Sequence, residues 1–488
     1  MHARGDRLLA GVPCELSTTG TIVADMVDLS KSARPLRIVL ISPKGPLYRH
    51  RGGIFGRGLR YKPLTLPTLA SLIPVEIAHT LTCYDEGIGD VPDFLEADII
   101  GMTVLTGSAT RAYELADRYR TQGIIVVLGG PHPTLIPDDA QPHADSVVVG
   151  YAEDTWPQLL RDLVAGTLQK RYVQGPGLSL AGRPLPKRDV LPRRRYLTEH
   201  VVEATRGCVH RCDFCVVPAA WPGKPLQKPP EDIVRDLVAM KARRAIFVDL
   251  NLIADRAYAL RLFAALEPLR IQWFGLATTL LADDDELLDA CARSGCRGLL
   301  MGLESISDAA LSGMRKGFND PATFARLVER LHAKRIALQG CFVFGGDEDR
   351  PGIFMETARF AVDAGIDLPR FAVLTPFPGT ALHRRLESEG RILDRRWERY
   401  DGQHVVFQPK HLTVDELQYG IEQAWRHCYS WSGIAKRMRK TAAPWYIAAI
   451  TNLTYRHYAR NLHRFYTCDV MSWDAPRGMA ITRLAPSA

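Results

Sequence analysis

The chain has 488 residues, of which 46% are hydrophobic and 24% charged, and its formal net charge is +8 at pH 7. This length exceeds what one ordinary core holds, so we expect two or three domains of a globular protein. Ten cysteines in so long a chain exclude a disulfide scaffold and suit a reducing cytoplasm. Basic and aromatic residues do not interleave in a stripe, which argues against a nucleic-acid partner. The sequence shows neither a signal peptide nor an apolar run of about 18 residues, so we expect no transmembrane segment.

The first third of the chain predicts a doubly wound α/β domain. Residues 1–33 lack periodicity and are expected to form an irregular extension. Between residues 34 and 172, apolar runs at 36–42, 80–84, 97–105, 124–128 and 146–149 alternate with helical patterns at 64–73, 108–122 and 155–165. Continuously apolar strands between helices are typical of a parallel sheet covered on both faces, as in Rossmann-like domains.

Small and polar residues follow three of these apolar runs. A parallel sheet binds ligands beyond the carboxyl ends of its strands, and small residues there let the backbone approach a large ligand. Ordinary turn chemistry would use the same residues, so spacing alone leaves both readings open. The candidate ligand-binding residues are Thr106, Ser108, Gly129, Gly130, Pro131, His132, Gly150 and Glu153.

Three cysteines near the middle of the chain are the strongest signal. Cys208, Cys212 and Cys215 follow the spacing CxxxCxxC, with Phe214 directly before the last cysteine. Three thiolates so close together can hold three irons of a [4Fe–4S] cluster and leave the fourth iron open. A structural zinc site usually has four ligands, and no second cysteine pair follows here. The spacing therefore predicts an iron–sulfur cluster.

The cysteine loop opens a second series of strands and helices. Residues 173–195 have the Pro-, Gly- and Arg-rich composition of a linker, and the series then runs from 196 to 398. Strands are expected at 201–205, 245–249, 272–277, 298–303, 337–344 and 370–374, with helices at 230–243, 256–267, 284–294, 321–334 and 353–364. Repeated βα units that close on themselves form a barrel with its active site at the strand ends.

Polar residues at these strand ends are candidate cofactor contacts, although turns or satisfied polar structure would explain each one as well. They are Asp249, Asn251, Thr278, Glu304 and Ser305. The region 399–488 is expected to be mostly helical and to cap the barrel with an amphipathic, aromatic-rich face. Contact of this region with a membrane surface or a lipid substrate is the alternative.

The cluster loop resembles that of the radical S-adenosylmethionine (SAM) enzymes. The unit at 35–170, with its Gly-Gly-Pro-His-Pro-Thr and Gly-x-x-Glu-Asp-Thr segments, resembles the cobalamin-binding domain of B12-dependent members of that family. The resemblance implies cobalamin on a Rossmann-like domain, a partial (β/α)6 barrel, and SAM at the open iron. It implies that Phe214 lies near SAM and that Glu304, with Ser305, contacts the ribose. It assigns no catalytic residue.

One motif departs from the family pattern. Many cobalamin proteins supply a cobalt ligand from a DxHxxG motif, but this chain has Tyr48 two residues before His50. An imidazole without its carboxylate partner is poorly oriented for a metal. We therefore expect cobalamin to bind without a nitrogen ligand from His50.

The resemblance implies an enzyme that methylates an unactivated carbon of a large substrate through a 5′-deoxyadenosyl radical and methylcobalamin. The candidates for this small-molecule substrate are apolar, lipid-like or tetrapyrrole-like compounds, and flavodoxin or ferredoxin would supply electrons. Three alternatives stay open. They are a cyclising, ring-rearranging or oxidising enzyme with the same cofactors, a radical SAM enzyme without cobalamin, and an iron–sulfur sensor.

Overall fold

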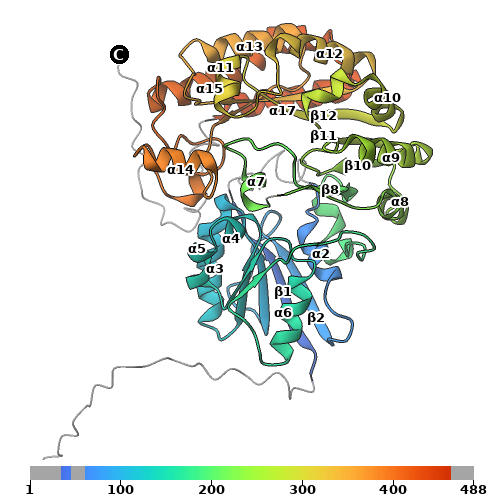
Figure 1. Cartoon of the computed structure of the whole chain (residues 1–488), viewed down its shortest axis with the longest axis vertical. Helices are drawn as coiled ribbons and strands as arrows, with labels where there is room; N and C mark the ends of the chain where they lie inside the picture. Colours follow the sequence, from blue (N-terminus) through green and yellow to red (C-terminus); the bar gives the residue numbers. More distant parts are fainter. Residues whose placement is uncertain (1–33, 46–60, 222, 463–488) are drawn as a thin grey trace, which may run out of the picture.

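The computed structural model describes residues 34–45, 61–221 and 223–462. The expectations for residues 1–33, for His50 and for the chain after residue 462 therefore lie outside the described residues. Two parallel sheets dominate the described part, the first in the lower half of Figure 1 and the second in the upper half. Among the described residues, no helix has the length and apolarity needed to cross a membrane.

The first sheet has the strand order β2-β1-β3-β4-β5-β6, and all its paired strands are parallel. Its strands are β1 Leu36–Ser42, β2 His79–Asp85, β3 Ile99–Thr103, β4 Ile125–Gly129, β5 Ser146–Val149 and β6 Arg171–Val173. The chain reverses direction across the sheet at β1 and β3, which makes this a topological switch point. The sequence predicted five of these strands. It missed β6 because this short edge strand lacks an apolar run and pairs only with β5.

Helices cover both faces of the first sheet, which confirms the doubly wound architecture. One face packs against α2 Thr65–Ser71 and α6 Thr155–Val164, and the other against α3 Ala109–Arg120 and α5 Pro137–Ala140. The prediction of a plain loop after β4 was wrong, because Pro131–Leu135 forms the short helix α4. Gly130, at a φ of 107°, caps this helix and Pro131 starts it, as favoured for proline at the first helical position.

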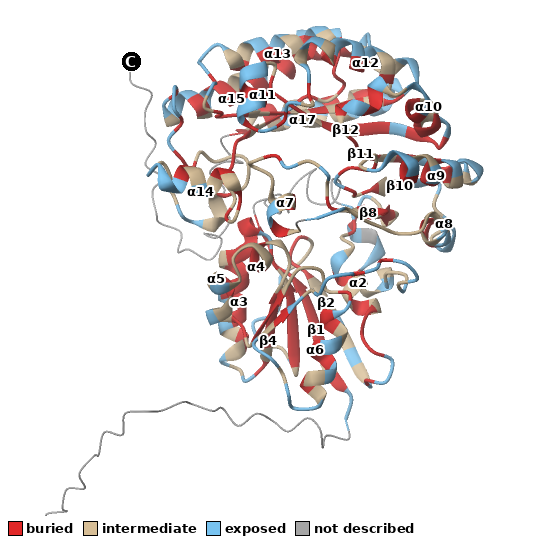
Figure 2. Ribbon diagram, in the orientation of Figure 1, coloured by how far each residue is buried: buried red, intermediate tan, exposed pale blue. Residues whose placement is uncertain are grey.

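The second sheet has the order β14-β13-β12-β11-β10-β7, again parallel throughout, with β14 and β7 as unpaired edges among the described residues. Its strands are β7 Val201–Val202, β10 Arg244–Phe247, β11 Gln272–Leu276, β12 Cys296–Glu304, β13 Ala337–Phe344 and β14 Arg370–Val373. The surrounding helices are α8 Pro230–Ala239, α9 Arg256–Leu266, α10 Asp285–Arg293, α11 Asp308–Gly313, α12 Phe324–Ala333 and α13 Ile353–Ala364. Open edges confirm the predicted partial barrel, and Figure 2 shows its buried strands beneath half-exposed helices.

The strand predicted at 201–205 is split in two. After β7 the chain forms a separate strand, β8 Thr205–Arg206, which pairs antiparallel with β9 Leu226–Gln227. The cysteine loop lies between these two strands, so the hairpin fixes both ends of the loop.

The C-terminal region is mostly helical, as predicted. Its helices are α14 Ala381–Ser388, α15 Val414–Cys428, α16 Trp431–Met438 and α17 Trp445–Arg460. Helix α15 begins with a capping box between Thr413 and Glu416 and packs against α13 and β14. Trp425 of α15 stacks on Tyr455 of α17 with ring centroids 6.0 Å apart. The aromatic residues of this region thus attach α17 to the barrel.

Candidate functional site

The three cysteines lie on one tight loop at the boundary between the two sheets. Gly207 has a φ of 94°, which turns the chain after β8, and the Cys215 amide donates to the Cys212 carbonyl over 3.1 Å. Cys212 is buried, whereas Cys208 and Cys215 are half-buried, and none of them forms a disulfide. Among the described residues, no three His, Cys, Asp or Glu side chains converge closely enough to hold one ion. Thiolates that bind separate irons need not converge in that way, so this loop fits a cluster.

Contacts with the far side of the barrel hold the cysteine loop in place. The Asp213 amide donates to the Met314 carbonyl over 3.2 Å, and the Asp213 carbonyl accepts from the Leu382 amide over 3.0 Å. The His210 ring stacks on Phe318, with 3.8 Å between centroids. Burial raises the pKa of Cys212 to about 11, so the thiol is protonated in the iron-free chain and iron binding must release that proton. The predicted Phe214 packs against the barrel core.

Glu304 ends β12 in a constrained conformation beside this loop. Its φ of 65° is unusual for a residue with a side chain, and its buried carboxylate pairs with Lys316. The electrostatic influence of both groups reaches Cys212. Asn319 donates from Nδ2 to the Gly302 carbonyl over 2.9 Å and so fixes the strand end. The sequence missed Lys316 and Asn319, because they lie in the loop after α11 and carry no motif.

The other predicted residues of the barrel rim differ in how well their polar groups are satisfied. Burial raises the pKa of Asp249 to about 7, and its carboxylate accepts from Thr205 Oγ1 over 2.8 Å. This hydrogen bond holds β8 in position, and β8 leads directly into the cysteine loop. Asn251 Oδ1 accepts from the Ile253 amide over 3.3 Å. Thr278 Oγ1 is buried without a hydrogen-bond partner in the part of the chain that the structure describes, and such a hydroxyl suits a polar contact with a bound ligand.

Ser305 completes the predicted set at the barrel rim. It is buried, and its Oγ accepts from the Ser307 amide over 3.1 Å. Its own amide donates to the Leu303 carbonyl over 2.9 Å. The structure thus brings Ser305 next to Glu304 at the end of β12 and gives its hydroxyl a backbone partner. A contact of either residue with the SAM ribose stays a prediction.

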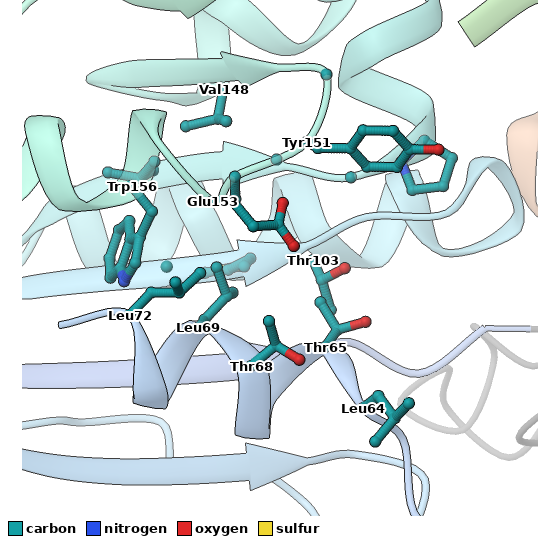
Figure 3. A pocket seen from close by; sticks show the side chains of 18 of the residues that line it. Leu64, Thr65, Thr68, Leu69, Leu72, Thr103, Val148, Tyr151, Glu153 and Trp156 are labelled. Carbon is teal, nitrogen blue, oxygen red and sulfur yellow. The ribbon is translucent and has the colours of Figure 1, made fainter. Parts of the chain in front are cut away.

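A cavity of about 250 Å³ opens beside the first sheet (Figure 3), and Glu203, Arg206 and Trp221, which lie on either side of the cysteine loop in the sequence, also line it. Leu69 of α2, Leu72 directly after it, Met102 of β3 and Trp156 of α6 form much of its apolar wall. A Cβ on Gly101 would lie 3.0 Å from Leu40 Cδ2 and 3.3 Å from Trp156 Cη2, so glycine keeps the floor open. Trp156 Nε1 is buried and has no hydrogen-bond partner among the described residues. An apolar hollow with one unused donor fits part of a large ring cofactor such as cobalamin.

The mouth of this cavity joins the two sheets. Tyr151, which follows β5, stacks on Trp221 with 5.0 Å between centroids, and the Arg206 guanidinium lies 4.9 Å from the Tyr151 ring centroid. Arg206 also pairs with Glu153 of the first domain and, over 2.7 Å, with Glu203. Since Arg206 lies two residues before Cys208, the cavity wall and the cysteine loop share this arginine. No sequence pattern marked Arg206 or Trp221 as partners of the first domain.

The predicted residues of the first sheet fall into two groups. Gly129, Gly130, Pro131, Gly150 and Glu153 line the cavity. Thr106, Ser108 and His132 are not among its lining residues, and their predicted contact with cofactor stays a prediction.

These three side chains have protein partners instead. The fully buried His132 ring lies 3.0 Å from the Tyr113 hydroxyl and 3.3 Å from Thr106 Oγ1. Ser108 borders a smaller hollow of about 90 Å³ beside Ser42 and Leu105, at the switch point between β1 and β3. This second hollow is where a doubly wound sheet conventionally meets its ligand.

Comparisons with known proteins agree with this geometry. Residues 81–160 match the B12 binding domain family, and residues 202–368 match the Radical SAM superfamily. The chain is 32% identical over 403 residues to bacteriochlorophyllide d C-12(1)-methyltransferase of Chlorobaculum tepidum, covering 78% of this chain and 86% of that protein. It is 27% identical over 429 residues to the C-8(2)-methyltransferase of the same organism, covering 83% and 94%.

A solved structure shares the fold. The cobalamin-dependent SAM radical enzyme OxsB, with aqua-cobalamin and SAM bound, superposes with a TM-score of 0.62 at 14% identity, covering 88% of this chain and 72% of that one. The chain belongs to the radical SAM enzymes that carry a B12-binding domain. It is a cobalamin-dependent radical SAM enzyme, and its cofactors are a [4Fe–4S] cluster, SAM and cobalamin.

Proposed function

We propose that the protein methylates a carbon atom of a large tetrapyrrole. The observation that carries the proposal is the junction, through the ion pair of Arg206 with Glu153, between the apolar cavity of the first domain and the strand that leads into the cysteine loop. This junction leaves the two cofactors able to act on one substrate. The substrate class is supported by the two Chlorobaculum tepidum relatives, whose names specify methylation of a bacteriochlorophyllide.

The chain's own residues position and enclose the cofactors. When bound, the cluster supplies the electron that cleaves SAM, and cobalamin carries the methyl group. In the proposal, Cys208, Cys212 and Cys215 hold the cluster, and the Glu304–Lys316 pair with Thr278 orients SAM at the strand ends. Tyr151 and Trp221 form a stacked wall at the cavity mouth that excludes water from the junction. A flavodoxin or ferredoxin would deliver the electron in the reducing cytoplasm.

A competing outcome uses the same cofactors. Cyclisation, ring rearrangement or oxidation would need the same cluster and cobalamin sites, because these residues serve the cofactors and do not choose the product. Methylation is favoured over these by the methyltransferase relatives, which the chain matches over most of their length.

The test follows the methyl group. Anaerobic holoenzyme receives SAM labelled in its methyl carbon, a reductant and a bacteriochlorophyllide, and products are analysed by mass spectrometry. We expect label first on cobalamin and then on a tetrapyrrole carbon, with one S-adenosylhomocysteine and one 5′-deoxyadenosine for each methyl transferred. The Cys208/Cys212/Cys215→Ala variant should give neither product. Conversion of the tetrapyrrole without incorporated label would establish the cyclising or oxidising outcome and reject methylation.

A further inference from the structure

Arg370 is the first residue of the edge strand β14, and its side chain lies on the inner side of the barrel. Side chains alternate along β14, and Phe371 and Val373 belong to the core. The Phe371 ring meets Trp425 of the outer helix α15 edge-on, with 5.6 Å between centroids. Arg370 and Ala372 must therefore face the opposite, inner side. The Arg370 side chain remains exposed there, at the edge strand that leaves the barrel open.

The Arg370 guanidinium has no hydrogen-bond or ion-pair partner in the described part of the chain. Arg437 shows the contrast, because its buried guanidinium donates to the Asp367 and Cys428 carbonyls. Burial opposes the charge on Arg370, yet the nearby Tyr455, Cys341 and Tyr458 raise its pKa. The group therefore stays charged among neutral neighbours. An accessible guanidinium on the inner side of the barrel, without a partner among the described residues, suits an anionic ligand.

The surroundings of Arg370 form a wall that connects to the cofactor region. Tyr455 of α17 accepts a hydrogen bond from Gln339 Nε2 over 3.1 Å, so α17 reaches the inner side of β13. Cys341 is paired with Arg370 on one side and with Gly302 on the other. At about 4.8 Å per strand, the Arg370 backbone lies roughly 10 Å from that of Gly302, next to Glu304. A large substrate can span this distance.

We propose that Arg370 binds a carboxylate of the substrate and so fixes which edge of the ring faces the cofactors. The proposal rests on the proposed function, because it takes the substrate to be a tetrapyrrole that carries a carboxylic acid side chain. A planar guanidinium pairs with a carboxylate through two parallel hydrogen bonds, which sets orientation as well as position. Gln339 and the Tyr455 hydroxyl, which are hydrogen-bonded to each other, would flank the bound carboxylate, and Tyr458 and Cys341 are also close to Arg370.

The experiment compares an acid with its ester. Chlorophyllide a has one free propionate, and its methyl ester has the same ring without the charge. Binding of each to anaerobic holoenzyme is measured by quenching of chlorin fluorescence. We expect wild type to bind the acid about tenfold or more tightly than the ester, in line with the strength of charged hydrogen bonds. Arg370→Gln should bind both compounds with the affinity of the ester, and Arg370→Lys should recover part of the difference.

Controls separate this role from folding and from the cofactor chemistry. Arg326→Gln, on the outer helix α12, should keep the acid preference of wild type. Because Arg370 has no hydrogen-bond or ion-pair partner among the described residues, Arg370→Gln should leave the melting temperature unchanged. Equal binding of acid and ester to wild type, an undiminished preference in Arg370→Gln, or no binding of either chlorin would overturn the proposal. Labelling of cobalamin without binding of either chlorin would leave the cofactor assignment standing and reject the tetrapyrrole substrate together with the anchor, whereas equal binding of acid and ester would reject the anchor alone.

Discussion

The two parallel sheets place their candidate sites in different ways. In the first sheet, the cavity lies against a face of the strands, where Gly101 and the apolar side chains of α2 and α6 leave room. In the barrel, the site lies at strand ends, where Glu304 pairs with Lys316 and Asp249 is held by Thr205. The first site selects its ligand by shape, whereas the second fixes charged and polar groups around the cluster loop. Mutations in the first sheet should therefore alter cofactor binding by changing the cavity volume, whereas mutations in the barrel should alter it by removing a charge or a cluster ligand.

The largest effect should come from the cysteines of the barrel. Replacing Cys208, Cys212 and Cys215 together by alanine should reduce the iron content from about four atoms per chain to none, because these three thiols are the proposed ligands of the cluster. Iron analysis and the visible absorbance of reconstituted protein measure this. Cys83→Ala, in β2 of the first sheet, is the control and should keep the cluster. Cobalamin binding should survive in the triple variant, since the cavity is built from other residues.

The link between the two regions should give the next largest effect. Arg206→Met leaves the buried Glu153 without its partner, whereas the half-buried Glu203 keeps its ion pair with Lys228, and breaking a buried pair costs about 3 kcal/mol. Thermal unfolding of the cofactor-free chain should show the loss. The double variant Arg206→Met/Glu153→Met should be more stable than the sum of its single changes predicts, because it removes the stranded charge. If the losses in free energy of unfolding of the two single variants add up to that of the double variant, the Arg206–Glu153 pair does not couple the two regions.

Filling the cavity should affect only the first region. Gly101→Val would place methyl groups within the space between Leu40 and Trp156, and overpacking costs about 1–3 kcal/mol. We expect cobalamin affinity to fall by about tenfold or more, measured by equilibrium dialysis, while the iron content stays unchanged. Gly89→Ala is the matched control, since a Cβ there meets no atom within 4 Å. A full-affinity Gly101→Val protein would mean that cobalamin does not use this cavity.

The sequence predicted these two regions unequally, for physical reasons. Apolar periodicity located helix Ile353–Ala364 to the residue, and the cysteine spacing pointed to ligand chemistry, since both are local patterns. The glycine-rich ends of the first sheet were ambiguous, because glycine serves turns and ligand cavities alike. Lys316, Trp221 and Arg370 were missed because their environments depend on contacts between segments far apart in the chain. The helix at Pro131 was missed because its glycines and prolines also suit a loop.

The smallest effect we predict concerns pH and the contact between the first region and the C-terminal segment. Asp139 accepts from Trp397 Nε1 over 3.1 Å, and hydrogen bonds with His132, then Tyr113 and Trp397, lower the pKa of its carboxyl against the opposing effect of burial. A depressed carboxyl pKa contributes stability above its unfolded value of about 3.9, and this contribution is lost as the pH falls through the folded value.

Asp139→Asn should therefore unfold at a lower temperature than wild type at pH 7 but lose less stability on acidification from pH 5 to pH 3. Thermal melts of the cofactor-free chain at several pH values measure the slope. Asp138→Asn changes the neighbouring, exposed carboxyl and should follow wild type closely. If the melting temperatures of wild type and Asp139→Asn changed in parallel with pH, the hydrogen bonds with His132 and Trp397 would not stabilise the ionised Asp139 carboxylate. The junction between the first domain and the segment at Trp397 would then rest on ring packing, such as the 5.3 Å edge contact of Trp397 with His132.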